Sequence, residues 1–429
     1  MIWAWILAAV ATSWLFCKKG IGWYHYIWIL LPIEMYGVNV AGATIKPYML
    51  FGCFIILDDL LKHRTLRVHA TLIAVAFVLI ISDYLTGFVM ASVMQHIMFM
   101  LVLLIGYCYQ DYQTDGIEFE EIGQVALATT IGYGLVFTVA WLAFSFGYSI
   151  NGIYASERLD AGIVLKLASF GGTVSSRLRG FCIDPNSVIA TLIPGASYAM
   201  ANITLKKKDI AKSVIGMAVY LAVVFYSGSR MALLCSIVLL VIFFIIGYRR
   251  SENKRRMAAI GVVGVLIICI LAFLNLNVII LEIAKIWADL FGERASLGSE
   301  YGRLTIWKTN LTYLIDNNKI WFGVGQNQIY LLTQRGLACH NTWLEWVCGI
   351  GIAFGLFMDG WFILAPIRFK KRVIGKVDMQ NVMPIILAYI TVVVCISTVD
   401  NITNSVLVFL MLILRYGTIT DDSVAERIV

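Results

Sequence analysis

Long apolar stretches separated by short polar ones recur along the whole chain. Most are close to 20 residues long, which is the length that a helix needs to cross the hydrocarbon core of a bilayer. The stretches are continuous rather than alternating, which argues against the strands of a membrane β-barrel. The pattern predicts spanning helices over 1–17, 20–38, 43–61, 68–85, 87–109, 123–149, 186–203, 210–228, 230–248, 257–277, 342–366 and 380–398. A thirteenth is predicted if the shorter stretch 402–415 also spans.

Composition leads to the same fold class. Of the 429 residues, 60% are hydrophobic and only 14% are charged, and the mean hydropathy is +0.84. Because lipid offers no hydrogen-bond partners, the backbone of each span must pair within its own helix. We therefore expect an all-α polytopic membrane protein with 12–13 transmembrane helices, forming a single domain over 1–429. Lys18 and Lys19 follow the first apolar stretch where a small-residue cleavage site would be needed, so no cleavable signal peptide is predicted.

The basic residues predict the orientation. Lys and Arg accumulate on the cytoplasmic side of membrane proteins, and here every basic cluster follows an odd-numbered span: 18–19, 62–67, 206–212, 249–256 and 368–376. Segment 110–121 should share that side, although it has no Lys or Arg. The loops 150–185 and 278–341 should then be extracytoplasmic. The net charge of +7 reflects this topology, and no basic stripe interleaved with aromatic residues indicates a nucleic-acid partner.

The longer outer loop, 278–341, has helical patterning of its own. Apolar residues between 301 and 315 recur at helical spacing, and Asp316-Asn317-Asn318 should end that helix. The sequence WFGVGQNQIY, which contains Gly325, predicts a glycine turn between two apolar edges. We expect this loop to pack on the bundle as a lid or side wall.

Several arginines lie on the predicted outer side, against the usual bias. Arg177 and Arg179 lie in RLRGFCIDPN, Arg230 in YSGSRMALL and Arg303 in SEYGRLT. A guanidinium group remains charged and matches the oxygens of a phosphate, so these residues are candidates for binding one. The alternatives are that Arg230 extends to the membrane interface with Ser229 as a helix cap, and that Arg303 lies on a solvated helix face.

Two short motifs predict helix starts. Asp184-Pro185-Asn186 places a capping side chain before a proline in the first turn. In CHNTWLEWVCGIGIAFGLF, Asn341 can cap the helix that follows, with His340 just outside it. His340 is also the only histidine in a predicted outer loop, and imidazole is suited to proton transfer near neutral pH. Both interpretations stay open from the residues alone. No second ligand stands at metal-binding spacing around His340.

The nine cysteines form no C-x-x-C pair, and most of them fall in apolar spans. They are typical of small buried residues. Cys182 and Cys339 both fall in outer loops, so a disulfide between them is a further possibility.

Taken together, RLRGFCIDPN, SGSRMALL, the outer loop with GVGQ and the closing HNTWLEWVCGIGIAFGLF resemble the bacterial O-antigen ligase and O-antigen or exopolysaccharide polymerase family, the WaaL-like and Wzy-like proteins. The resemblance covers roughly 177–357. It implies a C-type glycosyltransferase-like bundle with one large extracytoplasmic helical loop, in the bacterial inner membrane, and an active site facing the periplasm.

The resemblance also implies a reaction. A glycan would be transferred from undecaprenyl pyrophosphate to an acceptor hydroxyl by a metal-independent, inverting glycosyltransferase without a cofactor. His340 would activate or position the acceptor, and Arg179, Arg230 and Arg303 would hold the pyrophosphate. Supporting residues would be Arg177, Asp184, Asn186, Gly325 and Asn341. Membrane lipids, a chain-length regulator and a flippase would be partners.

The acceptor stays open. We expect a polymerase, which adds the glycan to another lipid-linked unit. The alternatives are a ligase that uses lipid A–core and an enzyme that uses protein. A transporter of polyprenyl lipids is a candidate of another class, but it would predict inverted repeats, and none is visible.

Overall fold

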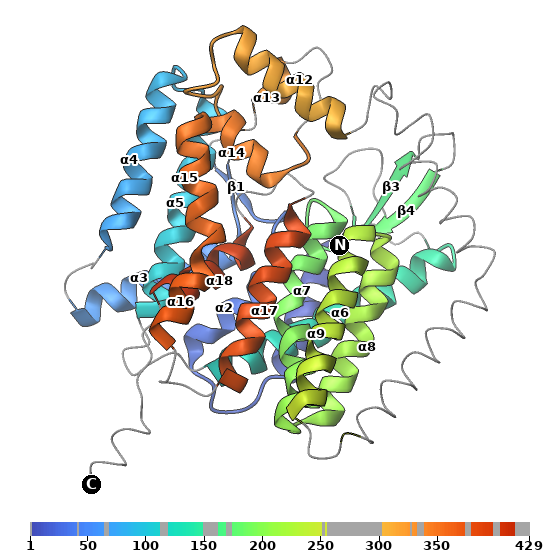
Figure 1. Cartoon of the computed structure of the whole chain (residues 1–429). Helices are drawn as coiled ribbons and strands as arrows, with labels where there is room; N and C mark the ends of the chain where they lie inside the picture. Colours follow the sequence, from blue (N-terminus) through green and yellow to red (C-terminus); the bar gives the residue numbers. More distant parts are fainter. Residues whose placement is uncertain are drawn as a thin grey trace.

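Apolar helices form the body of the structure, a computed structural model of the chain (Figure 1). The structure describes residues 2–40, 43–63, 68–111, 119–148, 162–168, 174–250, 254, 303–326, 328–332, 339–373, 379–397 and 404–416. Five of its helices are long and apolar enough to cross a membrane, namely those over Met90–Gln110, Phe119–Ser145, Pro185–Lys206, Ile210–Ser227 and Arg230–Arg250. The expected all-α polytopic membrane fold is confirmed.

Most predicted spans correspond to helices. Before loop 278–341 these are α1 (Ile2–Leu15), α3 (Pro47–His63), α4 (Ala70–Leu85), α5 (Met90–Asp111), α6 (Phe119–Ser145), α7 (Pro185–Ala201), α8 (Ile210–Ser227) and α9 (Arg230–Arg250). After it come α15 (Ile352–Ile363), α16 (Ala365–Val373), α17 (Met379–Ile396) and α18 (Ser405–Tyr416). The predicted span 257–277 lies outside the described residues, so the total number of spans stays a prediction.

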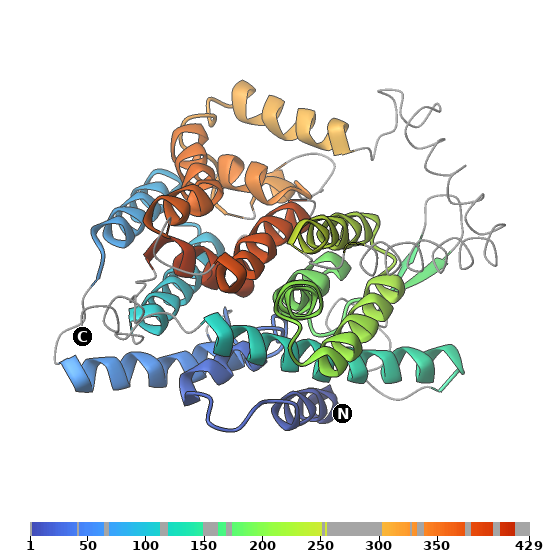
Figure 2. The same cartoon turned by 60° about the horizontal axis from the view of Figure 1, so that its bottom comes forward.

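Small residues let the central helices approach closely. α1 lies along α6 (Figure 2), where a Cβ on Gly132 would come within 2.2 Å of Ser13. A Cβ on Gly195 of α7 would come equally close, 2.2 Å, to the Ala126 carbonyl of α6. In lipid, where apolar side chains gain little by leaving the solvent, such close packing is a main source of helix association.

The span predicted over 20–38 is wrong as a continuous helix. It contains only a 3-10 turn, Trp23–Tyr26, and the short α2, Ile27–Leu30. Pro32 lacks an N–H and interrupts the helix. Side chains bind the freed carbonyls instead: Tyr133 donates to Ile29 O (2.7 Å) and Ser405 to Leu31 O (3.1 Å). An irregular segment can therefore lie buried, because its polar groups are bound by protein.

The span predicted over 342–366 is divided in two at Gly351. α14 (Thr342–Ile350) ends there and α15 begins, with Gly351 at φ +85°. Segment 320–326 lies against the break. Gly325 N–H donates to Gly349 O (2.9 Å), and Ile352 N–H donates to Ile320 O (2.9 Å). Both glycines of GIGI, Gly349 and Gly351, therefore serve this loop contact.

The stability of two matched glycine variants tests this account of the break. A Cβ on Gly351 would lie 2.0 Å from Trp321 O, in a left-handed conformation. We expect Gly351→Ala to lower the free energy of unfolding by about 2–4 kcal/mol. Gly360, also on α15, has nothing within 4 Å of its Cβ position. Gly360→Ala should be neutral or slightly stabilising. Thermal unfolding in detergent measures both, and equal midpoints would contradict this account of the break.

The bundle has two chemically different ends. We call the end with α12 (Arg303–Asp316) and the start of α14 the upper end, as it appears in Figure 1, and the opposite one the lower end. At the lower end Lys206 and Lys208 approach Glu120 (2.6 and 3.1 Å), and Lys212 donates to Phe16 O (2.5 Å). The acidic start of α6 thus shares an end with two basic clusters, as the alternation of loops predicted.

Two small hairpins were not predicted. β1 (Val38–Val40) pairs with β2 (Ala43–Ile45), and β3 (Val164–Ala168) pairs with β4 (Val174–Leu178), both antiparallel. The second lies in the loop 150–185 at the upper end (Figure 1). It delivers the chain from β4 directly to α7.

Candidate active site

His340 lies just before the start of α14, as predicted from CHNTW. Asn341 caps the helix, accepting hydrogen bonds from the backbone N–H groups of Trp343 (3.0 Å) and Leu344 (3.1 Å). The His340 side chain is exposed, and its backbone is left-handed, with φ +48°. A residue with a Cβ is strained in that conformation, and such strain is concentrated at functional sites.

Helix α12, in loop 278–341, packs beside this histidine. Trp307 donates its indole N–H to Cys339 O (2.9 Å), and Asn310 approaches Cys339 Sγ (3.3 Å). The prediction of a helix in loop 278–341 is confirmed, and it ends at Asp316 as expected. α12 thus contacts Cys339, the residue immediately before His340. In this position the helix forms a side wall next to His340.

Arg230 lies at the start of α9 with its side chain exposed. Ser229, directly before it, accepts from Ala232 N–H (3.1 Å) and so caps the helix, as the alternative interpretation of Arg230 expected. Ser229 also donates to the side-chain oxygen of Asn186. Asn186 belongs to the first turn of α7, which Asp184 caps by accepting from Asn186 N–H (2.6 Å). The starts of α7 and α9 are thereby joined next to Arg230.

Arg177 joins the β3–β4 hairpin to the same place. Its Nε donates to Ser227 O at the end of α8 (2.9 Å), and its stem packs against Gly228. The short turn between α8 and α9 is therefore fixed from one side by Arg177 and from the other by Asn186. The turn carries Arg230 in a defined position.

Arg179 is placed differently from the other arginines. Its side chain is fully buried, and its guanidinium donates to Gly162 O (2.9 and 3.1 Å) and to Met35 Sδ (3.2 Å). Here it fastens the hairpin to segment 34–35, whose N–H groups also bind Phe181 O. A phosphate would reach Arg179 only after Gly162 moved away, so a role in phosphate binding stays a prediction.

One helix end links the arginine group to His340. At the end of α17, Cys395 Sγ lies 3.5 Å from Asn186 O, and Ile396 O accepts from Thr342 Oγ1 (2.9 Å). Thr342 is the first residue of α14, two after His340. His340 and Arg230 therefore both lie at the upper end of the bundle, each next to a residue or a capped turn that contacts the end of α17.

The remaining predicted residues lie at the same end or at its border. Gly325, at φ +94°, belongs to the turn that supports α14. Arg303 is the first residue of α12, but its side chain lies outside the described part of the structure. Among the described residues, no group of three His, Cys, Asp or Glu side chains is placed to hold a metal ion.

The possible disulfide between Cys182 and Cys339 is not present. Both are free thiols with different neighbours: Cys182 Sγ lies 3.5 Å from Pro32 O, and Cys339 Sγ lies 3.6 Å from Cys348 Sγ. Burial, with the Glu34 carboxylate nearby, raises the pKa of the Cys182 thiol well above its usual range. Cys182 is therefore a neutral packing residue.

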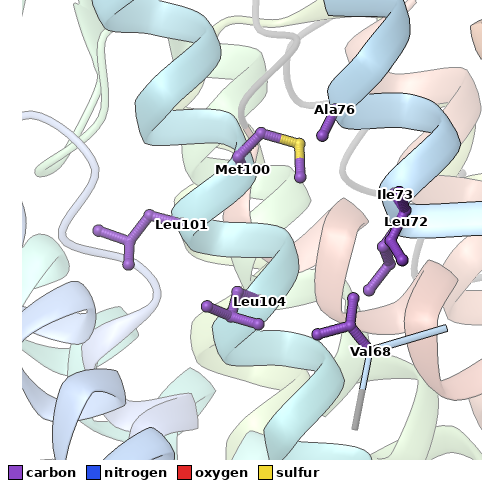
Figure 3. Close-up of a pocket in the computed structure, with 7 residues that line it drawn as sticks. All are labelled: Val68, Leu72, Ile73, Ala76, Met100, Leu101 and Leu104. Atoms are coloured by element: carbon purple, nitrogen blue, oxygen red, sulfur yellow. The ribbon is translucent and has the colours of Figure 1, made fainter. Parts of the chain in front are cut away.

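An apolar groove of about 310 Å³ lies between α4 and α5 (Figure 3). Its lining consists of Val68, Leu72, Ile73, Ala76, Met100, Leu101 and Leu104. None of these side chains can donate or accept a proton, and the groove suits a hydrocarbon chain. It is therefore not the site of the chemistry, which needs the polar groups of the upper end.

Sequence reasoning missed several buried polar residues at this end. Glu34 accepts from Asn404 (2.8 Å), and the Gln326 side chain donates to the backbone oxygen of Glu345 in α14. Each pair joins segments distant in the sequence, so spacing carried no signal. The apolar stretches of sequence around Glu34 and Glu345 could only have indicated that each carboxylate needs a partner.

Comparison with known protein families finds one match. A family model described as O-antigen ligase matches residues 215–358, which include Arg230, α12, Gly325 and His340. Segment 215–358 of the chain, about a third of its length, is therefore similar to the O-antigen ligase family. A search of curated proteins finds no match. The O-antigen ligase family consists of glycosyl-transferring enzymes of membrane polysaccharide assembly, with lipid-linked glycans as substrates. The match and the five apolar helices support a multi-pass membrane enzyme of that process.

Proposed function

We propose that this protein transfers a glycan from undecaprenyl pyrophosphate to the hydroxyl of a second lipid-linked glycan, and so acts as a polymerase. The observation that carries the transfer reaction is the arrangement around the end of α17, which brings an exposed imidazole, His340, to the same end as an exposed guanidinium, Arg230. The acceptor hydroxyl attacks the anomeric carbon of the donor with inversion, and the polyprenyl pyrophosphate leaves.

The two side chains divide the work. His340 accepts the proton of the attacking hydroxyl, a contribution that is typically worth 10²–10⁴-fold. Arg230 binds the pyrophosphate, whose negative charge grows as the glycosidic bond breaks, so a fixed guanidinium stabilises the transition state. The activated lipid supplies the driving force, and the residues present need no metal or cofactor for these two tasks.

Purified protein tests which acceptor is used. Incubation with lipid-linked repeat units alone should give a ladder of lipid-linked oligomers, because donor and acceptor are then the same kind of molecule. The ligase activity named by the family model is the second candidate. Product that forms only after lipid A–core is added would contradict the polymerase and establish the ligase.

The position of the site predicts a labelling pattern in cells. Lys319 is exposed at the upper end and Lys18 at the lower end. With the exposed Cys53 replaced by Ser, we expect Lys319→Cys to react with a membrane-impermeant maleimide in intact cells freed of their outer membrane. Lys18→Cys should react only in inverted vesicles. The reverse pattern would place the site in the cytoplasm and contradict a periplasmic reaction.

A further inference from the structure

A buried carboxylate and a buried imidazole join α4 to α5 at the upper end. Asp83 is 5% exposed and His96 3% exposed. His96 Nδ1 lies 2.9 and 3.0 Å from the two carboxylate oxygens of Asp83. Ser92 Oγ donates to the same carboxylate (3.1 Å). One carboxylate therefore fixes two side chains of α5 against α4.

Ser92 connects this cluster to the loop that supports α14. Because Ser92 donates its proton to Asp83, its oxygen is left to accept, and Gln326 N–H donates to it (2.9 Å). Gln326 is fully buried, and its side-chain amide donates to Glu345 O (3.3 Å) and lies 3.4 Å from Glu345 Oε1. The contacts run without interruption from Asp83 to α14.

The placement of α14 decides where His340 points. α14 has only nine residues, and His340 lies one residue before its cap. The helix is held at its start by Thr342, on its flank by Gln326, and at its end by Val324 and Gly325 N–H. Gln326 takes its own position from Ser92. A shift of the Asp83 cluster would therefore be transmitted to the imidazole.

Stability alone does not account for a polar cluster here. An apolar pair of similar volume would join α4 to α5 without removing a carboxylate and an imidazole from water, and such replacements are often neutral or stabilising. The polar groups add a defined orientation of the side chains, because each hydrogen bond fixes the distance and angle between a donor and its acceptor. Asp83, Ser92 and His96 also lie outside the segment 215–358 that matches the family model.

We propose that Asp83 and His96 are positioning residues for His340, acting through Ser92, Gln326 and Glu345. The proposal rests on the proposed function, because it assigns the cluster to the transfer reaction at His340. The two residues do not touch the substrates. They set the distance and angle between imidazole and acceptor, where a misplacement of 1 Å can cost about 10²-fold in rate.

Two substitutions of similar shape test this. His96→Asn keeps an N–H donor near the position of Nδ1, and His96→Leu removes it. We expect the Asn variant to keep kcat within about threefold of wild type. The Leu variant should lose about 10²-fold in kcat with the KM for the donor unchanged, as for a defect in the reacting geometry. Rates come from purified protein with lipid-linked repeat units.

A second pair uses two buried serines. Ser92→Ala removes the hydroxyl that joins Asp83 to Gln326 and should lower kcat in the same way. Ser82 is 1% exposed on α4, and its hydroxyl has no hydrogen-bond partner among the described residues. Ser82→Ala is the matched control and should keep kcat within about twofold. If His96→Leu does not accumulate in the membrane, the two serine variants alone test the positioning role.

The outcomes separate this proposal from the proposed function. Equal kcat in the Asn and Leu variants, or in the two serine variants, would overturn the positioning role, as would a change in KM alone. If wild type transfers glycan and His340→Ala does not, such a result leaves the proposed function standing. Absence of transfer by wild type with any acceptor would overturn the proposed function itself.

Discussion

Replacing His340 by alanine is expected to abolish glycan transfer while leaving the protein folded in the membrane. The imidazole is exposed, so its removal costs little packing. Its loss as a base should lower kcat by about 10²–10⁴-fold. The assay is oligomer formation by purified protein, with the amount of protein in the membrane measured in parallel. A wild-type rate in His340→Ala would contradict the assignment of the base.

Glycine at the same position separates activity from stability. His340 has φ +48°, which glycine adopts without strain and alanine does not. We expect His340→Gly to be as inactive as His340→Ala but more stable by about 1 kcal/mol. Thermal unfolding in detergent compares the two. A less stable Gly variant would show that the left-handed backbone is not a source of strain.

The second large effect is expected at Arg230. Arg230→Ala should lower kcat/KM by about 10²–10³-fold, the usual cost of removing one group that stabilises developing negative charge. Arg230→Lys should recover only part of it, since an ammonium group keeps the charge but not the planar fork. Rates at several concentrations of lipid-linked donor give both parameters.

Arg249 supplies the control for this experiment. It is exposed on the same helix, α9, but at the lower end of the bundle. Arg249→Ala removes an equal charge and should keep kcat/KM close to wild type. Equal losses in Arg230→Ala and Arg249→Ala would mean that the effect comes from net charge or insertion, and would contradict binding of the pyrophosphate at Arg230.

The features that could be predicted from the sequence are those that depend on near neighbours. Asp184 and Asn341 cap their helices through N–H groups two or three residues away, so a few letters contain the whole interaction. Hydropathy likewise predicts burial in lipid from a single stretch. The helices and the position of His340 before α14 follow from such local rules.

The features that could not be predicted depend on distant parts of the chain. Segment 20–38 is apolar enough for a helix, yet Tyr133 and Ser405 bind its carbonyls in an irregular conformation. Hydropathy reports burial, and it does not report which conformation is buried. Arg179 shows the same limit, because its charge suggested a ligand while its placement against Gly162 O depends on the fold of the hairpin.

The last described helix has a consequence for the order of biosynthesis. Ser405 to Arg415 of α18 are buried throughout, against α5, α16 and α17 rather than lipid. Asn404 and Ser405, at its start, bind Glu34 and Leu31 near the beginning of the chain. The ribosome must therefore deliver α18 before the upper end can close around segment 31–34. Nascent chains already inserted in the membrane would remain without a completed site until then, which delays glycan transfer until α18 has been synthesised.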